Sequence, residues 1–167
     1  LGAAAVMWPQ SDEVKALHFG ISLIAFASTV LVAAMMYDID SWDKLRDHPV
    51  TARLRWVVWG LTAYTYIVVY LGAYVRHTNS MLACTDWPLC NGSVFPGFSG
   101  PVGIAFSHRV SAAVLVIGMI ALLRWTHGLR EYRPDLYWGS ILAVFFVIAP
   151  AIGGGIVVLT KVDTFAT

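Results

Sequence analysis

Charged residues are scarce in this chain of 167 residues, because Asp, Glu, Lys and Arg together make up only 13% of it. A soluble domain carries about a quarter charged residues, so the composition argues against one. The net charge of +1 leaves no basic surface for a phosphate backbone, which excludes a nucleic-acid-binding protein. Cysteine is also rare, and two cysteines are too few for a small disulfide scaffold. Apolar residues make up 58% of the chain, which excludes a disordered protein and indicates a membrane protein.

Four apolar segments account for most of this hydropathy, whose mean over the chain is +0.69. Each segment has 20 or more residues and ends near charged residues. A helix of that length spans a hydrocarbon core of about 30 Å at about 1.5 Å per residue. The alternative, buried helices in a large soluble core, is much less favoured. The sequence therefore predicts an all-α, polytopic transmembrane helical bundle with four spanning helices, at about residues 16–37, 56–75, 102–123 and 136–160.

Basic residues lie mainly on one side of these helices. The segments between the first and second helices and between the third and fourth hold seven of the eleven Lys and Arg residues: Lys44, Arg46, Arg53, Arg55, Arg124, Arg130 and Arg133. The positive-inside rule makes that side cytoplasmic, which places the loop of residues 76–101 on the outer face. Residues 1–13 lack the basic start and the apolar run of a signal peptide, so we expect no cleaved leader.

The outer loop is rich in Gly, Pro, Asn and Ser, which favours ordered turns over a further helix. Its aromatic residues Trp87, Phe95 and Phe98 suit the headgroup level of the membrane. Cys84 and Cys90 bracket five residues, whereas a thioredoxin-like motif has two. A disulfide in an oxidising outer compartment is the interpretation that we favour, and a metal-binding pair is the alternative.

Two histidines lie within the predicted helices, His18 near the outer end of the first and His108 near the outer end of the third. An ionisable group in a spanning segment is costly and usually faces a bundle interior or a cofactor. Either histidine alone could be a satisfied bundle residue. Two at similar depth favour axial ligation of heme iron, whereas zinc is less favoured because no carboxylate accompanies them. His48 and His127 fall in the inner loops, where we expect solvated side chains.

Small or polar residues follow each of the two histidines at helical spacing. Ser22, Ala25 and Thr29 follow His18, and Ala112 follows His108. Such residues leave room for a flat macrocycle, but they also permit close packing between helices.

Arg109 follows His108 directly and lies inside an apolar span. It therefore needs either a counter-charge, which a heme propionate at the outer interface would supply, or a path for its side chain to the headgroups. Both interpretations stay open. Arg76 and His77, at the outer end of the second helix, are weaker candidates for contact with a heme propionate.

The stretch LGAYVRHTNSMLACTDWPLCNGSVFPG, followed by FSHRVSAAVLVIG, resembles the heme A synthase family, and this similarity is specific over residues 71–118. A looser similarity covers ALHFGISLIAFA at 16–27 and GGGIVVLT at 153–160. The resemblance implies an eight-helix protein built from two four-helix halves, of which this chain forms helices four to seven. It also implies two histidines in each half, with a partner for each histidine of this chain on a helix outside it.

The resemblance assigns the two histidines to different hemes. His18 would be a ligand of the first-half site, where heme o is oxidised, and His108 a ligand of the second-half site, which holds heme b. The family's E-x-x-H element is missing, because Ala105 stands three residues before His108. The catalytic carboxylate would therefore lie outside this chain, and the catalytic residues stay unknown.

The implied function is oxidation of a methyl group of heme o to the formyl group of heme a, with electrons leaving through the heme b half. The alternative is a non-catalytic heme-binding or structural membrane subunit of a respiratory or photosynthetic complex. We expect an integral protein of a prokaryotic plasma membrane. Expected partners are membrane lipid, heme o, and heme O synthase or a respiratory complex.

Overall fold

The computed structural model describes residues 2–7, 11–37 and 49–160. It contains the short helix α1 (Gly2–Met7) and four long helices: α2 (Asp12–Tyr37), α4 (Ala52–His77), α5 (Gly100–His127) and α6 (Pro134–Thr160). Among the described residues, these four are the helices long and apolar enough to cross a membrane. The prediction of an all-α bundle with four spanning helices is confirmed.

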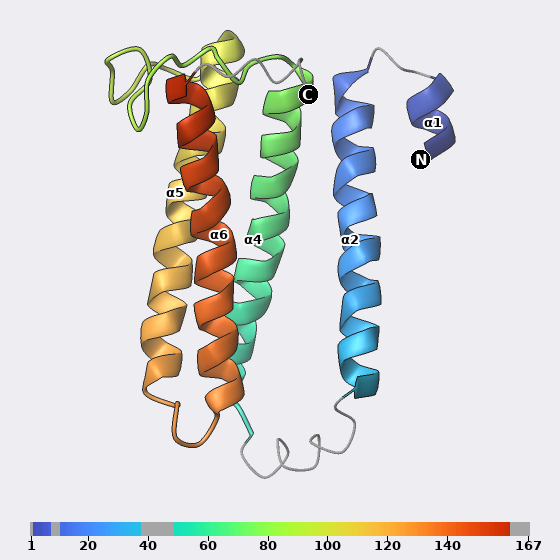
Figure 1. Ribbon diagram of the computed structural model, residues 1–167, viewed down its shortest axis with the longest axis vertical. Helices are drawn as coiled ribbons and strands as arrows, with labels where there is room; N and C mark the ends of the chain where they lie inside the picture. Colours follow the sequence, from blue (N-terminus) through green and yellow to red (C-terminus); the bar gives the residue numbers. More distant parts are fainter. Residues whose placement is uncertain (1, 8–10, 38–48, 161–167) are drawn as a thin grey trace.

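The four long helices run up and down and pack in chain order (Figure 1). Helix α4 lies between α2 and α5, and α6 packs against α5. The long connection 78–99 lies at the end of the bundle where α2 and α5 begin and where α4 and α6 end. We call this the loop end, and the other the opposite end. Residues near the start of α5 and the finish of α4 therefore meet at the loop end.

All four long helices start before their predicted spans, and α4 and α5 also end after them. The Oγ1 atom of Thr51 accepts a hydrogen bond of 3.3 Å from the backbone N–H of Leu54 and caps the start of α4. Hydropathy marks only the part of a helix that lies in hydrocarbon, whereas backbone hydrogen bonding continues to the cap. Placing Arg53, Arg55 and Arg124 in connecting segments was therefore wrong, because they lie on the ends of α4 and α5.

The loop predicted at 76–101 is shorter in the structure, because Arg76 and His77 are the last residues of α4 and α5 begins at Gly100. Helix α1 was not predicted, since its six residues are too few to show a periodic pattern. The predictions for Lys44, Arg46 and His48 concern residues outside the described ranges. The prediction that His127 lies in a loop is wrong, because it is the last residue of α5. Its side chain is exposed, as expected, and lies beside Arg130.

The buried core joins α4, α5 and α6. Leu54 and Val68 from α4 pack with Leu115, Met119 and Leu122 from α5, and side chains of α6 cover this cluster. Outward-facing residues are apolar as well, which suits lipid contact rather than water. Within the helices, Ser and Thr hydroxyls donate to the carbonyl four residues earlier, so these polar groups are paired inside apolar segments.

Candidate functional site

His108 lies on α5 eight residues after Gly100, near the loop end. Its imidazole ring packs against α4 at Gly72. A Cβ atom added to Gly72 would lie 3.0 Å from Cε1 and 3.4 Å from Nε2 of the ring. The Nδ1 atom of His108 is buried and has no hydrogen-bond partner among the described residues. The ring is thus held by packing between two helices and by a hydrogen bond to the backbone carbonyl of Val68, whereas Nδ1 is unpaired among the described residues.

Arg109, the next residue, directs its guanidinium into the 78–99 loop. Its NH1 group donates to the backbone carbonyls of Asp86, at 2.7 Å, and of Leu89, and its NH2 group donates to the carbonyl of Cys84 at 3.2 Å. These partners differ from the heme propionate, which is one of the two interpretations that the sequence leaves open for Arg109. The propionate contact stays a prediction. In the structure, the guanidinium of Arg109 holds the 78–99 loop through these three hydrogen bonds.

Cys84 and Cys90 lie at disulfide-bonding distance, with their Cα atoms 4.6 Å apart. Both are buried and pack with Ala105 and Val102, which share one face of α5. Ala105 stands where a glutamate would be in an E-x-x-H element. In this chain its methyl group instead contacts the cysteine pair, so a longer carboxylate side chain would collide with the loop.

A network of hydrogen bonds orders the segment between the two cysteines. The carboxylate of Asp86 accepts from the backbone N–H groups of Gly92 at 2.7 Å and Asn91 at 2.5 Å. The Oδ1 atom of Asn91 accepts from the backbone N–H and hydroxyl of Thr85. The hydrogen bond from Gly92 is the main reason that the pKa of Asp86 lies below its ordinary value. The loop is therefore ordered, as its turn-rich composition indicates.

The loop is also anchored to α6 through Trp87. A Cβ atom on Gly155 would lie 3.0 Å from Cδ2 of the Trp87 indole. Gly155 is buried, and its lack of a side chain lets the indole lie on the helix backbone. The 78–99 loop thus contacts both α5, through Arg109 and Ala105, and α6, through Trp87.

His18 lies six residues after Asp12 on α2, also near the loop end, and is half-buried. Its ring makes no hydrogen bond with the residues that the structure describes, and its backbone carbonyl accepts from Ser22 at 2.8 Å. The side chains of Ser22, Ala25 and Thr29 are exposed along α2. Helix α4 separates α2 from α5, so the structure does not place His18 and His108 on facing helices (Figure 1).

Arg76 is exposed and His77 is half-buried at the end of α4. Neither side chain forms a hydrogen bond or an ion pair with another described residue. The structure therefore leaves both available at the loop end but brings neither into contact with His108. No three His, Cys, Asp or Glu side chains within the described ranges gather as a group that could hold a metal ion.

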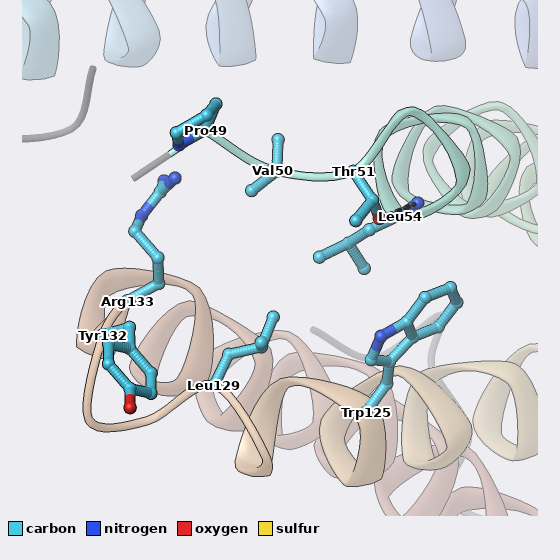
Figure 2. A pocket seen from close by; sticks show the side chains of 8 residues that line it. All are labelled: Pro49, Val50, Thr51, Leu54, Trp125, Leu129, Tyr132 and Arg133. Atoms are coloured by element: carbon cyan, nitrogen blue, oxygen red, sulfur yellow. Dashed lines mark hydrogen bonds between the residues drawn. The ribbon is translucent and has the colours of Figure 1, made fainter. Parts of the chain in front are cut away.

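A pocket of about 300 Å³ opens at the opposite end of the bundle (Figure 2). The side chains of Leu54, Leu129 and Trp125 surround it, with Arg133 at its edge. Arg133 forms a salt bridge of 2.8 Å with Asp135, and Arg53 lies 5.5 Å from the Trp125 ring. This pocket contains no histidine, so it is separate from the two histidines and their surroundings.

Sequence reasoning missed Gly72, Gly155 and the three carbonyls that hold Arg109. Glycine is common in apolar spanning helices, so its identity alone does not show which glycine another side chain contacts. Backbone carbonyls exist at every residue and carry no sequence signal. The nearest available signal was the position of Gly72 within the stretch LGAYVRH that carries the family resemblance.

Comparison with known proteins places these features in a family. Residues 1–167 match the cytochrome oxidase assembly proteins of the COX15-CtaA family. The chain is 41% identical to the heme A synthase of Geobacillus kaustophilus over 99% of its length, and this covers 52% of that relative. It is 44% identical to the heme A synthase of Symbiobacterium thermophilum over 93% of its length, again covering 52% of the relative.

A third relative, the heme A synthase of Halalkalibacterium halodurans, is 40% identical over 99% of this chain, which covers 55% of the relative. The chain therefore spans about half the length of the curated relatives that it matches. The family match extends over the whole chain and includes both histidines, the cysteine pair and Arg109. This chain belongs to the COX15-CtaA family of cytochrome oxidase assembly proteins, the family of the heme A synthases.

Proposed function

We propose that this chain forms helices four to seven of a heme A synthase, an oxidoreductase that converts a methyl group of heme o to the formyl group of heme a. The observation that best supports this proposal is the ring of His108, which is packed at the loop end with a buried Nδ1 atom that has no partner among the described residues. An imidazole whose ring nitrogen is buried without a partner in a membrane helix fits an axial ligand of heme iron.

His108 would be a ligand of heme b, and His18 a ligand at the site of heme o. The bound heme b would supply one-electron transfer, which carries electrons away from the substrate. His108 would hold its heme at a fixed depth, because its ring is confined between α4 and α5. The separation of α2 from α5 by α4 supports two different hemes rather than one iron shared by both histidines.

At the edge of this site we propose that Arg109, Arg76 and His77 face the heme propionates. Arg109 already donates to three loop carbonyls, so a propionate would be bound by its remaining N–H groups. The exposed Arg76 has its full set of donors available. We also propose that Cys84 and Cys90 form a disulfide and that the loop end faces outward from a prokaryotic plasma membrane. Membrane lipid, heme o, and heme O synthase or a respiratory complex are the proposed partners.

The test is expression of the full-length gene product containing this sequence in a bacterium that lacks heme A synthase. Extracted hemes are separated by chromatography, and heme b in the purified protein is measured by absorption spectroscopy. We expect heme A to form with the parent protein, and both heme A and bound heme b to be lost with His108→Ala. His127→Ala, at the exposed opposite end of the same helix, is the matched control.

The alternative function, a non-catalytic heme-binding subunit, gives a different outcome. Heme b would be bound through His108, but no heme A would form in the expressing cells. If neither heme is bound and no heme A forms, both interpretations are wrong.

A further inference from the structure

The contact between His108 and Gly72 involves the part of the imidazole around Cε1. A Cβ atom at position 72 would lie 3.0 Å from Cε1, 3.4 Å from Nε2 and 3.6 Å from Nδ1. The added Cβ atom would therefore stand closest to Cε1, which lies between the two ring nitrogens. Real Cβ atoms are rarely so close to a neighbour as 3.0 Å, so any side chain at position 72 would force the ring to move.

Hydrogen bonding does not fix this ring through Nδ1, which has no partner among the described residues. A histidine that binds a metal usually has its second nitrogen fixed by a hydrogen bond, which sets the orientation of the ring. The ring hydrogen-bonds to the backbone carbonyl of Val68, and α4 lies against the ring around Cε1 at Gly72. Packing against Gly72 is therefore the second contact, beside this hydrogen bond, that limits the ring's orientation.

The backbone of α4 has little freedom to yield at this point. Val68, one turn before Gly72, is buried in the core with Leu115 of α5. The hydroxyl of Tyr64, two turns before, donates to the backbone carbonyl of Ser111 at 3.3 Å. With α4 and α5 held together by these contacts, a methyl group at position 72 displaces the imidazole rather than the helix.

We propose that Gly72 is a positioning residue for His108, and that its missing side chain sets the orientation of the imidazole toward the heme. This inference rests on the proposed function, in which His108 is a heme ligand. Gly60, on the same helix, has nothing within 4 Å of an added Cβ atom. The contact at Gly72 is thus not a general property of glycines in α4.

The first experiment compares Gly72→Ala with Gly60→Ala in the purified full-length protein. Both substitutions give α4 the same gain in helix propensity, but only the first adds a methyl group beside the ring. We expect Gly72→Ala to shift the electron paramagnetic resonance signal and the midpoint potential of the heme bound by His108. Its heme affinity should fall by about tenfold, as for the loss of other groups that orient a metal ligand. Gly60→Ala should match the parent, and a Gly72→Ala protein with the parent's signal, potential and affinity overturns the proposal.

The second experiment needs no heme and still decides the matter if Gly72→Ala folds poorly. Thermal unfolding of the heme-free protein is measured for Gly72→Ala, His108→Ala and the double variant. Because alanine at position 108 removes the ring that the added methyl group would displace, the effect of Gly72→Ala should disappear in the His108→Ala background. An undiminished effect there shows that Gly72 serves general helix packing, and the proposal is wrong.

The two proposals fail in distinguishable ways. If His108→Ala retains heme b at the parent's level, the ligand assignment is wrong, whatever Gly72→Ala does. If His108→Ala loses heme b but Gly72→Ala leaves its spectrum and potential unchanged, only the positioning role of Gly72 is wrong.

Discussion

Arg109 shows how a charged side chain is accommodated next to the membrane interior without a carboxylate partner. Its guanidinium donates to the carbonyls of Cys84, Asp86 and Leu89, which belong to a loop about 20 residues earlier in the chain. A planar group with five donors can bind several carbonyls at once, which a lysine ammonium cannot do in the same geometry. The residue that follows the candidate ligand therefore fixes the loop above it.

We expect Arg109→Lys to loosen the segment of residues 84–93 and Arg109→Met to loosen it more. Each hydrogen bond of a charged donor contributes about 1.5–3 kcal/mol, less where solvent screens the group. Hydrogen–deuterium exchange of the loop amides measures the effect. Arg55→Met, at the exposed opposite end of the bundle, is the control.

If the propionate contact also exists, Arg109→Lys should retain less heme than the parent protein, and Arg109→Met should retain less than Arg109→Lys. Unchanged heme retention with a loosened loop would assign Arg109 to the loop alone. Parent-like exchange of the loop amides in both variants would contradict the hydrogen bonds described above.

Asp86 makes the order of the loop dependent on pH. Its pKa in the folded loop is lowered, chiefly because it accepts from the Gly92 N–H. A carboxylate with a lowered pKa contributes stability that is complete above its ordinary pKa of about 4 and is lost as pH falls through the lower value. We expect the Gly92 amide to exchange more slowly in the parent than in Asp86→Asn at neutral pH, and this difference to shrink below about pH 4. A difference that is constant with pH would show that the carboxylate charge is unimportant.

At the scale of elements, the 78–99 loop and helix α6 meet where Trp87 lies on Gly155. We expect Gly155→Ala to destabilise the protein by about 1–3 kcal/mol, the usual cost of adding a group to a packed contact. Gly154→Ala is the control, because an added Cβ atom there has nothing within 4 Å. The control should be neutral or slightly stabilising through helix propensity. Thermal unfolding in detergent distinguishes the two, and equal unfolding temperatures would show that the indole shifts freely.

The cysteine pair is the other element-scale feature of the loop. We expect peptide mass spectrometry without reductant to find Cys84 linked to Cys90. A link between residues six apart in sequence contributes about 2 kcal/mol on a chain-entropy estimate. Two alkylated thiols in protein taken from an oxidising compartment would contradict the proposed disulfide.

For the whole molecule, the testable property is its orientation in the membrane. In a Cys84→Ser, Cys90→Ser background, single cysteines are introduced as Val94→Cys in the loop and Glu131→Cys at the opposite end, both at exposed positions. A membrane-impermeant maleimide should label Val94→Cys in intact cells and Glu131→Cys only after lysis, because basic residues concentrate at the opposite end. The reverse pattern would overturn the proposed orientation.

The sequence by itself determined the fold class and the number of spanning helices. In lipid, every backbone polar group must be paired within its own segment, so a long apolar run has few alternatives to a helix. The sequence also identified the cysteine pair by its short spacing in the loop. It identified His18 and His108 as candidate ligands, since an ionisable group in an apolar span is unusual. Their roles as ligands stay predictions.

Only the tertiary structure decided where the helices end and what surrounds His108 and Arg109. Helix ends depend on caps such as Thr51, which hydropathy does not register. Gly72, Gly155 and the loop carbonyls matter because segments distant in the chain approach one another closely there. A backbone atom or a missing side chain has the same chemistry at every position, so its partner is fixed by three-dimensional proximity and not by residue type.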